Sequence, residues 1–117
     1  NNGSEIKQTM KETFPKSTVM ALKDRVEYAD GGVVSKQVLK NEAGNITLFS
    51  FDKGQGLSEH TAPFDAFVQI LDGRVEIVLD GTPLRLKEGE SLIMPAGVKH
   101  SLQAVERFKM LLTMIKG

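Results

Sequence analysis

The 117-residue chain contains no cysteine, which excludes disulfides, thiolate metal sites and a cysteine nucleophile. It also lacks an excess of either charge, because 15 basic side chains balance 15 acidic ones. Nothing in this balance favours nucleic acid or an anionic membrane as a partner. No apolar run approaches the roughly 18 residues of a membrane span, and the polar N-terminal region lacks the apolar core of a signal peptide. These absences together predict a cytoplasmic protein.

The residues that are present suffice for one domain with a buried core. Hydrophobic residues make up 40% of the chain and charged residues 26%, as in ordinary globular proteins. Residues 1–32 are expected to form an N-terminal extension. Within it, the spacing of Ile6, Met10 and Phe14 predicts a short helix that ends before Pro15. The expected anchors that follow this helix are Val19, Leu22 and Val26. Arg107, Lys109 and Lys116 are interpreted as solvated surface charges.

From Val33 onward, short alternating segments separated by turn residues indicate an antiparallel β structure. Strands are predicted near residues 33–40, 45–51, 57–62, 65–71, 74–80, 82–87, 91–94, 99–105 and 107–115. The dipeptides Asp72-Gly73 and Asp80-Gly81 indicate two-residue hairpin turns, because aspartate and glycine tolerate the positive φ that such turns need. So many short strands in one all-β domain predict a jelly roll or a similarly closed architecture.

The chain has only two histidines, and each stands in a segment with regularly spaced glycines. The spaced residues are Gly54, His60 and Gly73 in the first segment, and Gly89, Pro95, Gly97 and His100 in the second. These spacings closely resemble the paired motifs of the cupin superfamily, as a small single-domain member of the conserved-barrel type. The resemblance implies a double-stranded β-helix (jelly-roll) barrel over residues 33–117, with residues 1–32 as a short arm.

Three motif positions depart from the family pattern. The family's second histidine is replaced by Ala62, its glutamate by Ala66 (or by Phe67 with the longer spacer) and its final asparagine by Ala104. In the family, the motif histidines and glutamate hold a divalent metal such as manganese, iron, nickel or zinc. The resemblance therefore implies a degenerate metal site on an intact scaffold.

Because side chains alternate along a strand, His60, Ala62 and Ala66 are expected to point into the barrel, as are His100 and Ala104. The two histidines are then expected to face each other across a pocket. Two imidazoles are fewer ligands than catalytic zinc or non-haem iron normally has.

Two nearby carboxylates are not expected to complete the set. Glu59 and Asp65 should point away from the histidines unless a β-bulge changes the parity of the strand. We therefore expect no firm metal site and no cofactor. A weakly bound divalent transition metal at the two histidines is the alternative.

Alanine at the three motif positions predicts a wide, apolar pocket that suits a partly apolar ligand. Phe49, Phe64, Met94, Met110, Leu112 and Met114 are candidate wall residues, although ordinary core packing is the commoner use of such side chains. The predicted ligand-binding residues are His60, His100, Ala62, Ala66, Ala104, Phe49, Met94 and Met110. No catalytic residue is assigned.

Three functions remain open at this stage. The preferred hypothesis is a small-molecule binding or sensing protein of the cupin type. The alternative is an enzyme, either a metal-dependent oxygenase or isomerase with an incomplete site or a metal-free isomerase with a histidine base. A third possibility is a structural homodimer with a vestigial pocket. A homodimer formed through the sheets and the N-terminal arm is expected in every case.

Overall fold

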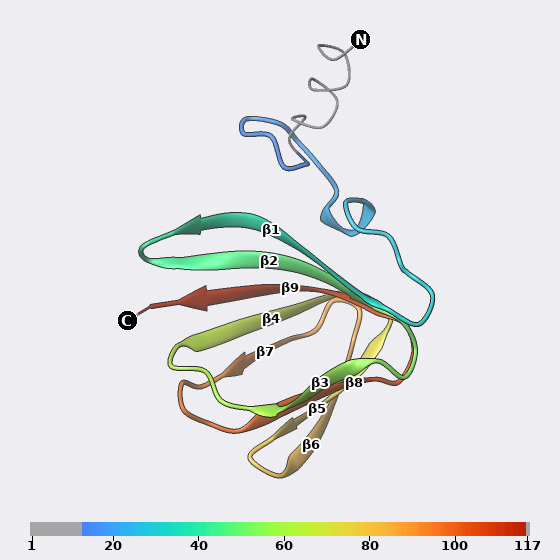
Figure 1. Ribbon diagram of the computed structural model, residues 1–117, viewed down its shortest axis with the longest axis vertical. Coiled ribbons are helices and arrows are strands. Elements are labelled where there is room, and N and C mark those ends of the chain that lie inside the picture. The colour runs from blue at the N-terminus through green and yellow to red at the C-terminus, as the bar shows by residue number, and fades with distance from the viewer. Residues whose placement is uncertain (1–12, 117) are drawn as a thin grey trace.

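This computed structural model describes residues 13–116 of the chain. These residues contain nine β-strands and one turn of 3₁₀ helix (Figure 1). The elements are η1 (Leu22–Asp24), β1 (Val33–Asn41), β2 (Gly44–Phe51), β3 (Gly56–His60), β4 (Asp65–Asp72), β5 (Arg74–Leu79), β6 (Thr82–Lys87), β7 (Ser91–Met94), β8 (His100–Ala104) and β9 (Phe108–Ile115). All nine strands lie where the alternation predicts them, with ends that differ by at most two residues. The helix predicted over residues 6–14 falls almost entirely outside the described residues.

The strands form two antiparallel sheets that stack face to face. The first sheet has the order β1-β2-β9-β4-β7, and the second has the order β3-β8-β5-β6. Figure 1 shows the sheets meeting along one side and spreading apart on the other, where the β1–β2 hairpin and the end of β9 lie. The predicted all-β jelly roll is confirmed.

The two Asp-Gly turns have different roles. Asp80-Gly81 joins β5 to β6 as a two-residue hairpin, with Leu79 paired to Thr82 and positive φ at both turn residues. Asp72-Gly73 joins β4 in the first sheet to β5 in the second, and these strands do not pair. The hairpin predicted there is wrong, because a residue suited to positive φ allows a sharp turn without deciding which sheet receives the next strand.

The core fills the space between the inner faces of the two sheets. Its buried members are Phe51, Ala66, Val68, Ile70, Val75, Ile77, Leu86, Met94, Leu102, Ala104, Phe108 and Met110. The rings of Phe51 and Phe108 stack with centroids 4.6 Å apart. Along each strand these residues recur at every second position, so the period-two pattern of the sequence is the cause of the core.

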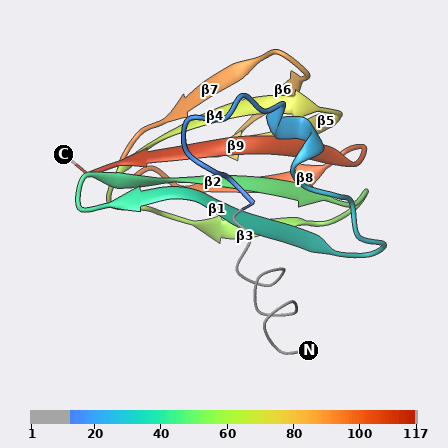
Figure 2. The same cartoon turned by 90° about the horizontal axis from the view of Figure 1, so that it is seen from above.

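The end of the N-terminal extension covers part of the outer face of the first sheet (Figure 2). Val26 and Leu48 of β2 are fully buried there, as the sequence predicts for Val26. The Ser50 hydroxyl donates to the Glu27 carbonyl over 2.7 Å, and the Tyr28 hydroxyl donates to Asp72 over 2.5 Å. Burial and the Asp72 carboxylate raise the pKa of Tyr28 well above its ordinary value.

The predictions about single residues outside the core have different outcomes. Val19 is fully exposed and anchors nothing in the described part of the chain, so the prediction for it is wrong. Arg107 is exposed as predicted and Lys109 is half-buried, and both also contact the extension. The Arg107 guanidinium lies 4.5 Å from the centre of the Tyr28 ring, and the Lys109 ammonium donates to the carbonyl of Lys23 over 2.5 Å.

Asp52 joins the same group of contacts. It accepts from the Gly31 and Lys53 backbone N–H groups, which hold the pKa of its carboxyl below the usual value, and Arg107 adds to this effect. The bridge from Arg107 to Asp52 measures 3.2 Å. Within residues 13–116 no helix has the length and apolar character needed to cross a membrane.

Candidate functional site

The two histidines lie side by side on neighbouring strands of the second sheet. His60 ends β3 and His100 begins β8, and the two residues are direct cross-strand partners. Their ring centroids are 4.3 Å apart, with the rings inclined at 64°. The expectation that they face each other across a pocket is therefore wrong. They form one contacting pair on a single sheet.

A β-bulge in β3 creates this pair. Leu57 pairs with Leu102 and His60 pairs with His100, so β3 has one more residue between the two pairs than β8 has. Leu57 packs against the core. In a regular strand His60, three residues later, would point to the opposite face. The additional residue turns the His60 side chain back to the inner side of the sheet. Bulges often redirect a side chain in this way near functional sites.

Backbone carbonyls determine which ring nitrogen carries the proton in each histidine. Nδ1 of His60 is 2.7 Å from the Ser58 carbonyl oxygen, and Nδ1 of His100 is 3.1 Å from that of Val98. Because a carbonyl only accepts, Nδ1 must be the nitrogen that carries the proton in each ring. In the neutral imidazoles, both Nε2 atoms then keep a free lone pair. The pair thus presents two adjacent acceptors.

The two rings differ in their access to solvent. His100 is only 5% exposed, whereas His60 is an exposed residue at the end of its strand. The difference follows from position, because β3 is the edge strand of the second sheet and β8 is an inner strand. An arriving molecule therefore meets His60 first and His100 beneath it.

An apolar row faces the interior at the same end of the first sheet. Ala66 lies between Met94 of β7 and Met114 of β9 in the strand register. Short loops lead from this row to the histidines, from His60 to β4 and from Met94 to His100. Figure 1 shows both loops at the spread end of the sheets.

Two hydrogen bonds tie these loops together. The Gly97 N–H donates to the Ala62 carbonyl, and the Ala96 N–H donates to an Asp65 carboxylate oxygen, each over 2.8 Å. The Asp65 carboxylate is thus used in the scaffold, and Glu59 is exposed.

The structure brings together only part of the predicted ligand-binding set. His60, His100, Ala62, Ala66 and Met94 lie on or beside the two loops that lead from this row to the histidines, and Ala66, Met94 and His100 are buried. The other three predicted residues, Ala104, Phe49 and Met110, lie deeper. Ala104 is four residues from His100 along β8, about 13 Å at the usual strand rise. Phe49 pairs with Met110 at the level of Ile70, within the packed core.

Asn45 is a site residue that the sequence analysis missed. It pairs with Met114 and so joins the row of Ala66 and Met94. Its Oδ1 is buried and has no hydrogen-bond partner within the described residues, an uncommon state for a buried polar atom. Asn45 has the strand parity of Phe49 and Phe51, which could have indicated that it faces inward. Its position beside the Asn41 to Gly44 turn concealed this signal.

The residues present do not fit the family's metal site. Among the described residues no group of three or more histidines, cysteines or carboxylates is close enough to hold a metal ion. The two Nε2 atoms alone fall short of the three protein ligands usual for catalytic zinc, or two histidines and a carboxylate for iron. The site is better described as two hydrogen-bond acceptors beside an apolar wall.

Comparisons with known proteins agree with this fold. The cupin domain family model matches residues 47–115, a range that includes both histidines. A protein of unknown function from Streptococcus pyogenes has 38% identity and a TM-score of 0.86, covering 91% of this chain and 93% of its own. A cupin superfamily protein from Desulfitobacterium hafniense has 27% identity and a TM-score of 0.85, covering 91% of this chain and 97% of its own.

One sequence relative covers most of this chain. An uncharacterized protein from Aquifex aeolicus is 29% identical over 101 residues, which are 85% of this chain and 84% of that protein. The family match spans more than half of the chain and coincides with the barrel and its histidine pair. The chain belongs to the cupin domain family.

Proposed function

We propose that this chain binds a small, partly apolar molecule that donates hydrogen bonds, at the end of the barrel where His60 and His100 lie. The observation that carries the proposal is the state of the two rings. Each Nδ1 is committed to a backbone carbonyl and the two rings are in contact, so the two Nε2 atoms are left as acceptors on adjacent rings. A hydroxyl group of a ligand is the natural partner for such a nitrogen.

The surrounding side chains favour an apolar body on the same ligand. Ala66, Met94 and Met114 form the opposite row, and the thioether side chains of methionine adapt to varied apolar shapes. The Oδ1 of Asn45 in this row has no partner within residues 13–116 and offers a third acceptor. A phenol or an aryl alcohol combines the required donor and apolar surface. Each ligand hydrogen bond is expected to contribute about 1 kcal/mol.

A metal-free enzyme is the second candidate. The buried His100, with its free Nε2 next to a second imidazole, has the arrangement of a general base. A matching segment occurs in a protein named polyketide synthase CurC from Streptomyces cyaneus, 34% identical over 64 residues, 54% of this chain and 42% of that protein. For either function we place the protein in the cytoplasm, a compartment compatible with a cysteine-free chain.

The test uses two probes, of which only one has a hydrogen-bond donor. Phenol has a hydroxyl hydrogen, whereas anisole replaces it with a methyl group. We expect ligand-observed NMR of untagged protein to show binding of phenol at least tenfold tighter than that of anisole. The His60→Ala and His100→Ala variants should lose this preference. Ser101→Ala, a change of the residue next to His100 on β8 that points to the other face, is the matched control.

Equal binding of the two probes, or a preference that persists in both histidine variants, would contradict the proposal. The same preparations, made without chelators or a nickel column, are suited to elemental analysis. A near-stoichiometric metal that is lost with His60→Ala would instead support the metal-dependent enzyme. Deuterium exchange next to the carbonyl of an aryl ketone, unaffected by a chelator and lost with His100→Ala, would support the metal-free one.

A further inference from the structure

The inner face of the first sheet continues one step beyond its apolar row. β4 and β9 pair so that Ala66 lies opposite Met114, and both side chains pack against the core. Two residues nearer the end where the sheets spread apart, the same antiparallel register places Phe64 opposite Lys116. Both residues have the parity of Ala66 and Met114, so they belong to the inner side of the sheet. We call Phe64 and Lys116 the rim pair.

The two members of the rim pair are in contact. Nζ of Lys116 lies 5.7 Å from the centre of the Phe64 ring, within the range of a cation–π interaction. The Lys116 backbone N–H donates to the Ala43 carbonyl over 2.8 Å, which anchors the start of the side chain. Lys116 is exposed, as the sequence predicts, and its ammonium forms no ion pair among residues 13–116. The charge is therefore available to an anion.

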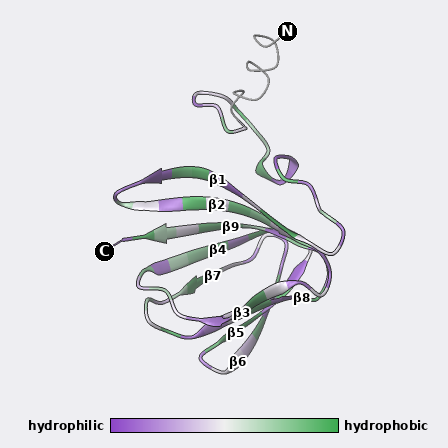
Figure 3. Ribbon diagram, viewed as in Figure 1, coloured by the Kyte–Doolittle hydropathy of each residue, from purple (hydrophilic) through white to green (hydrophobic). Residues whose placement is uncertain are grey.

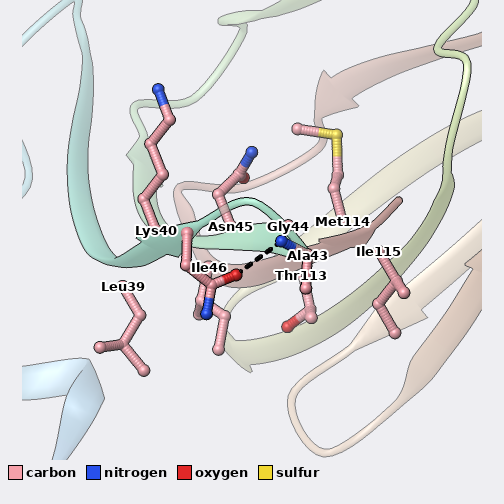
Figure 4. Close-up of a pocket in the computed structure, with 10 residues that line it drawn as sticks. Leu39, Lys40, Ala43, Gly44, Asn45, Ile46, Thr113, Met114 and Ile115 are labelled. Atoms are coloured by element: carbon pink, nitrogen blue, oxygen red, sulfur yellow. Dashed lines mark hydrogen bonds between the residues drawn. The ribbon is translucent and has the colours of Figure 1, made fainter. Parts of the chain in front are cut away.

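A second lysine adds positive charge on the same side. Lys40 pairs with Asn45, and Figure 4 shows both side chains on the side of the sheet that carries Met114, with Leu39 and Thr113 on the other. Figure 3 shows hydrophilic colour where β1 ends and where the chain leaves β9. β1 lies two strands from β9, about 10 Å away. Lys40 can thus attract the ligand that Lys116 contacts.

The acidic residues of the adjoining segments do not neutralise this charge. Asp65 has the opposite parity to the rim pair, and its carboxylate accepts from the Ala96 N–H over 2.8 Å. Glu59 lines a depression with Ser101 on the outer face of the second sheet. Glu42, in the turn after β1, is exposed and forms no ion pair within the described residues. The inner side of this end is therefore positively charged, although the whole chain has no net charge.

We propose that the ligand is an aromatic hydroxy acid whose carboxylate is held by Lys116. This inference rests on the proposed function, which supplies the contact between the ligand hydroxyl and the histidines. The aromatic ring then lies against the apolar row, and the carboxylate takes the place of the Phe64 ring as the partner of the ammonium. A lysine ammonium has three donors and pairs with a carboxylate as a compact point charge.

The loop between β3 and β4 sets the distance between the two polar ends of the ligand. Phe64 follows His60 by four residues, so their Cα atoms lie at most about 14 Å apart. The side chains of His60 and Lys116 extend into this span from its two ends. A phenol ring with a short acid side chain is long enough to bridge the remainder. Phenol alone meets the histidines and leaves the lysine without its carboxylate partner.

The test uses 3-(4-hydroxyphenyl)propionate and its primary amide, which share the hydroxyphenyl group and differ in charge. We expect ligand-observed NMR at neutral pH and low salt to show the acid binding about fivefold tighter, the upper range for an exposed ion pair. Lys116→Met keeps most of the apolar stem and should make the two affinities equal. Lys53→Met is the matched control, because Lys53 is an exposed lysine in the turn between β2 and β3, at the other end of β3 from His60.

Salt provides a second readout of the same contact. Raising the salt concentration from about 20 mM to about 500 mM screens exposed charges. The affinity of wild type for the acid should therefore fall towards that for the amide. In Lys116→Met, the affinity for the acid should change much less with salt.

The phenol and anisole pair separates this inference from the proposed function. Wild type that prefers phenol to anisole but binds acid and amide equally would overturn the inference and leave the proposed function standing. Wild type with neither preference would overturn both. A preference for the acid that survives Lys116→Met, or that Lys53→Met also removes, would assign the effect to the general charge of the chain. Lys116→Met must keep the preference for phenol, which shows that the histidine site is intact in this variant.

Discussion

His60 and His100 offer the same ring nitrogen because each donates from Nδ1 to a carbonyl two residues earlier in its own segment. The spacing of the glycines and histidines is enough to predict that both rings lie in one region of the barrel. It does not predict that they touch, because the contact depends on the bulge in β3. A bulge places one extra residue in one strand relative to its partner, and the alternation within a single segment does not show where this occurs.

Asn45 illustrates a second limit at the scale of a residue. Alternation along β2 predicts which way its side chain points, whereas hydrogen-bond satisfaction depends on strands β4 and β9, far along the chain. The buried Oδ1 has no partner among the described residues, and a ligand donor can remove this stability cost. Buried polar groups without a partner are uncommon in native proteins.

Replacing Asn45 by leucine should therefore stabilise the free protein. We expect the free energy of unfolding to rise by about 1 kcal/mol, because a buried acceptor without a partner is removed. Binding of phenol should weaken at the same time. Asn41→Leu is the matched control, since Asn41 Oδ1 accepts from the Ala43 N–H over 2.8 Å and its loss should cost about as much. Urea unfolding of both variants measures the difference, and a destabilised Asn45→Leu protein would show that the amide is satisfied.

At the scale of elements, the alternating pattern and the turn residues predict all nine strands of residues 33–116. The connections are harder to predict, as Asp72-Gly73 shows. This dipeptide resembles Asp80-Gly81, yet it carries the chain from one sheet to the other. The reason lies outside the dipeptide, where Gly73 meets the backbone of Arg107, 34 positions later in the chain.

Alanine substitutions at these two glycines should differ sharply in cost. Both have positive φ, +77° at Gly73 and +82° at Gly81, so each substitution costs about 1 kcal/mol from backbone strain. A Cβ at Gly81 meets nothing within 4 Å, whereas one at Gly73 would lie 1.9 Å from the Arg107 carbonyl oxygen. We expect Gly81→Ala to lose about 1 kcal/mol and Gly73→Ala more than about 3 kcal/mol. Equal losses in urea unfolding would mean that the crossing between sheets relaxes freely.

For the whole molecule, the extension and the barrel are joined by polar contacts as well as by burial. Tyr28 lies at the centre of these contacts, with its hydroxyl on Asp72 and with the Arg107 and Lys109 cations 4.5 and 4.9 Å from its ring centre. The sequence indicates the anchor Val26 through its apolar character. The sequence does not indicate that Tyr28 joins the extension to the barrel, because the partners of Tyr28 come from β4, β9 and the turn before β9.

The chain's single tyrosine makes this junction measurable by pH. The ordinary pKa of tyrosine is about 10, and the pKa of Tyr28 in the folded protein is higher because of burial and Asp72. The folded state therefore favours the protonated ring, and its contribution to stability is complete below about pH 10. As the pH rises from there through the folded pKa, that contribution is lost.

We expect wild type to exceed Tyr28→Phe in free energy of unfolding by about 1 kcal/mol at pH 8, the net value of one hydrogen bond. The difference should shrink steadily above about pH 10. The nearby Arg107, Lys109 and Glu88 are present in both proteins, so the comparison isolates the tyrosine. Urea unfolding at successive pH values measures the difference, and ultraviolet absorbance of the phenolate reports the ionisation directly. A difference that stays constant to pH 11, or a phenolate that forms at the ordinary tyrosine pKa, would show that the junction between extension and barrel does not depend on this hydrogen bond.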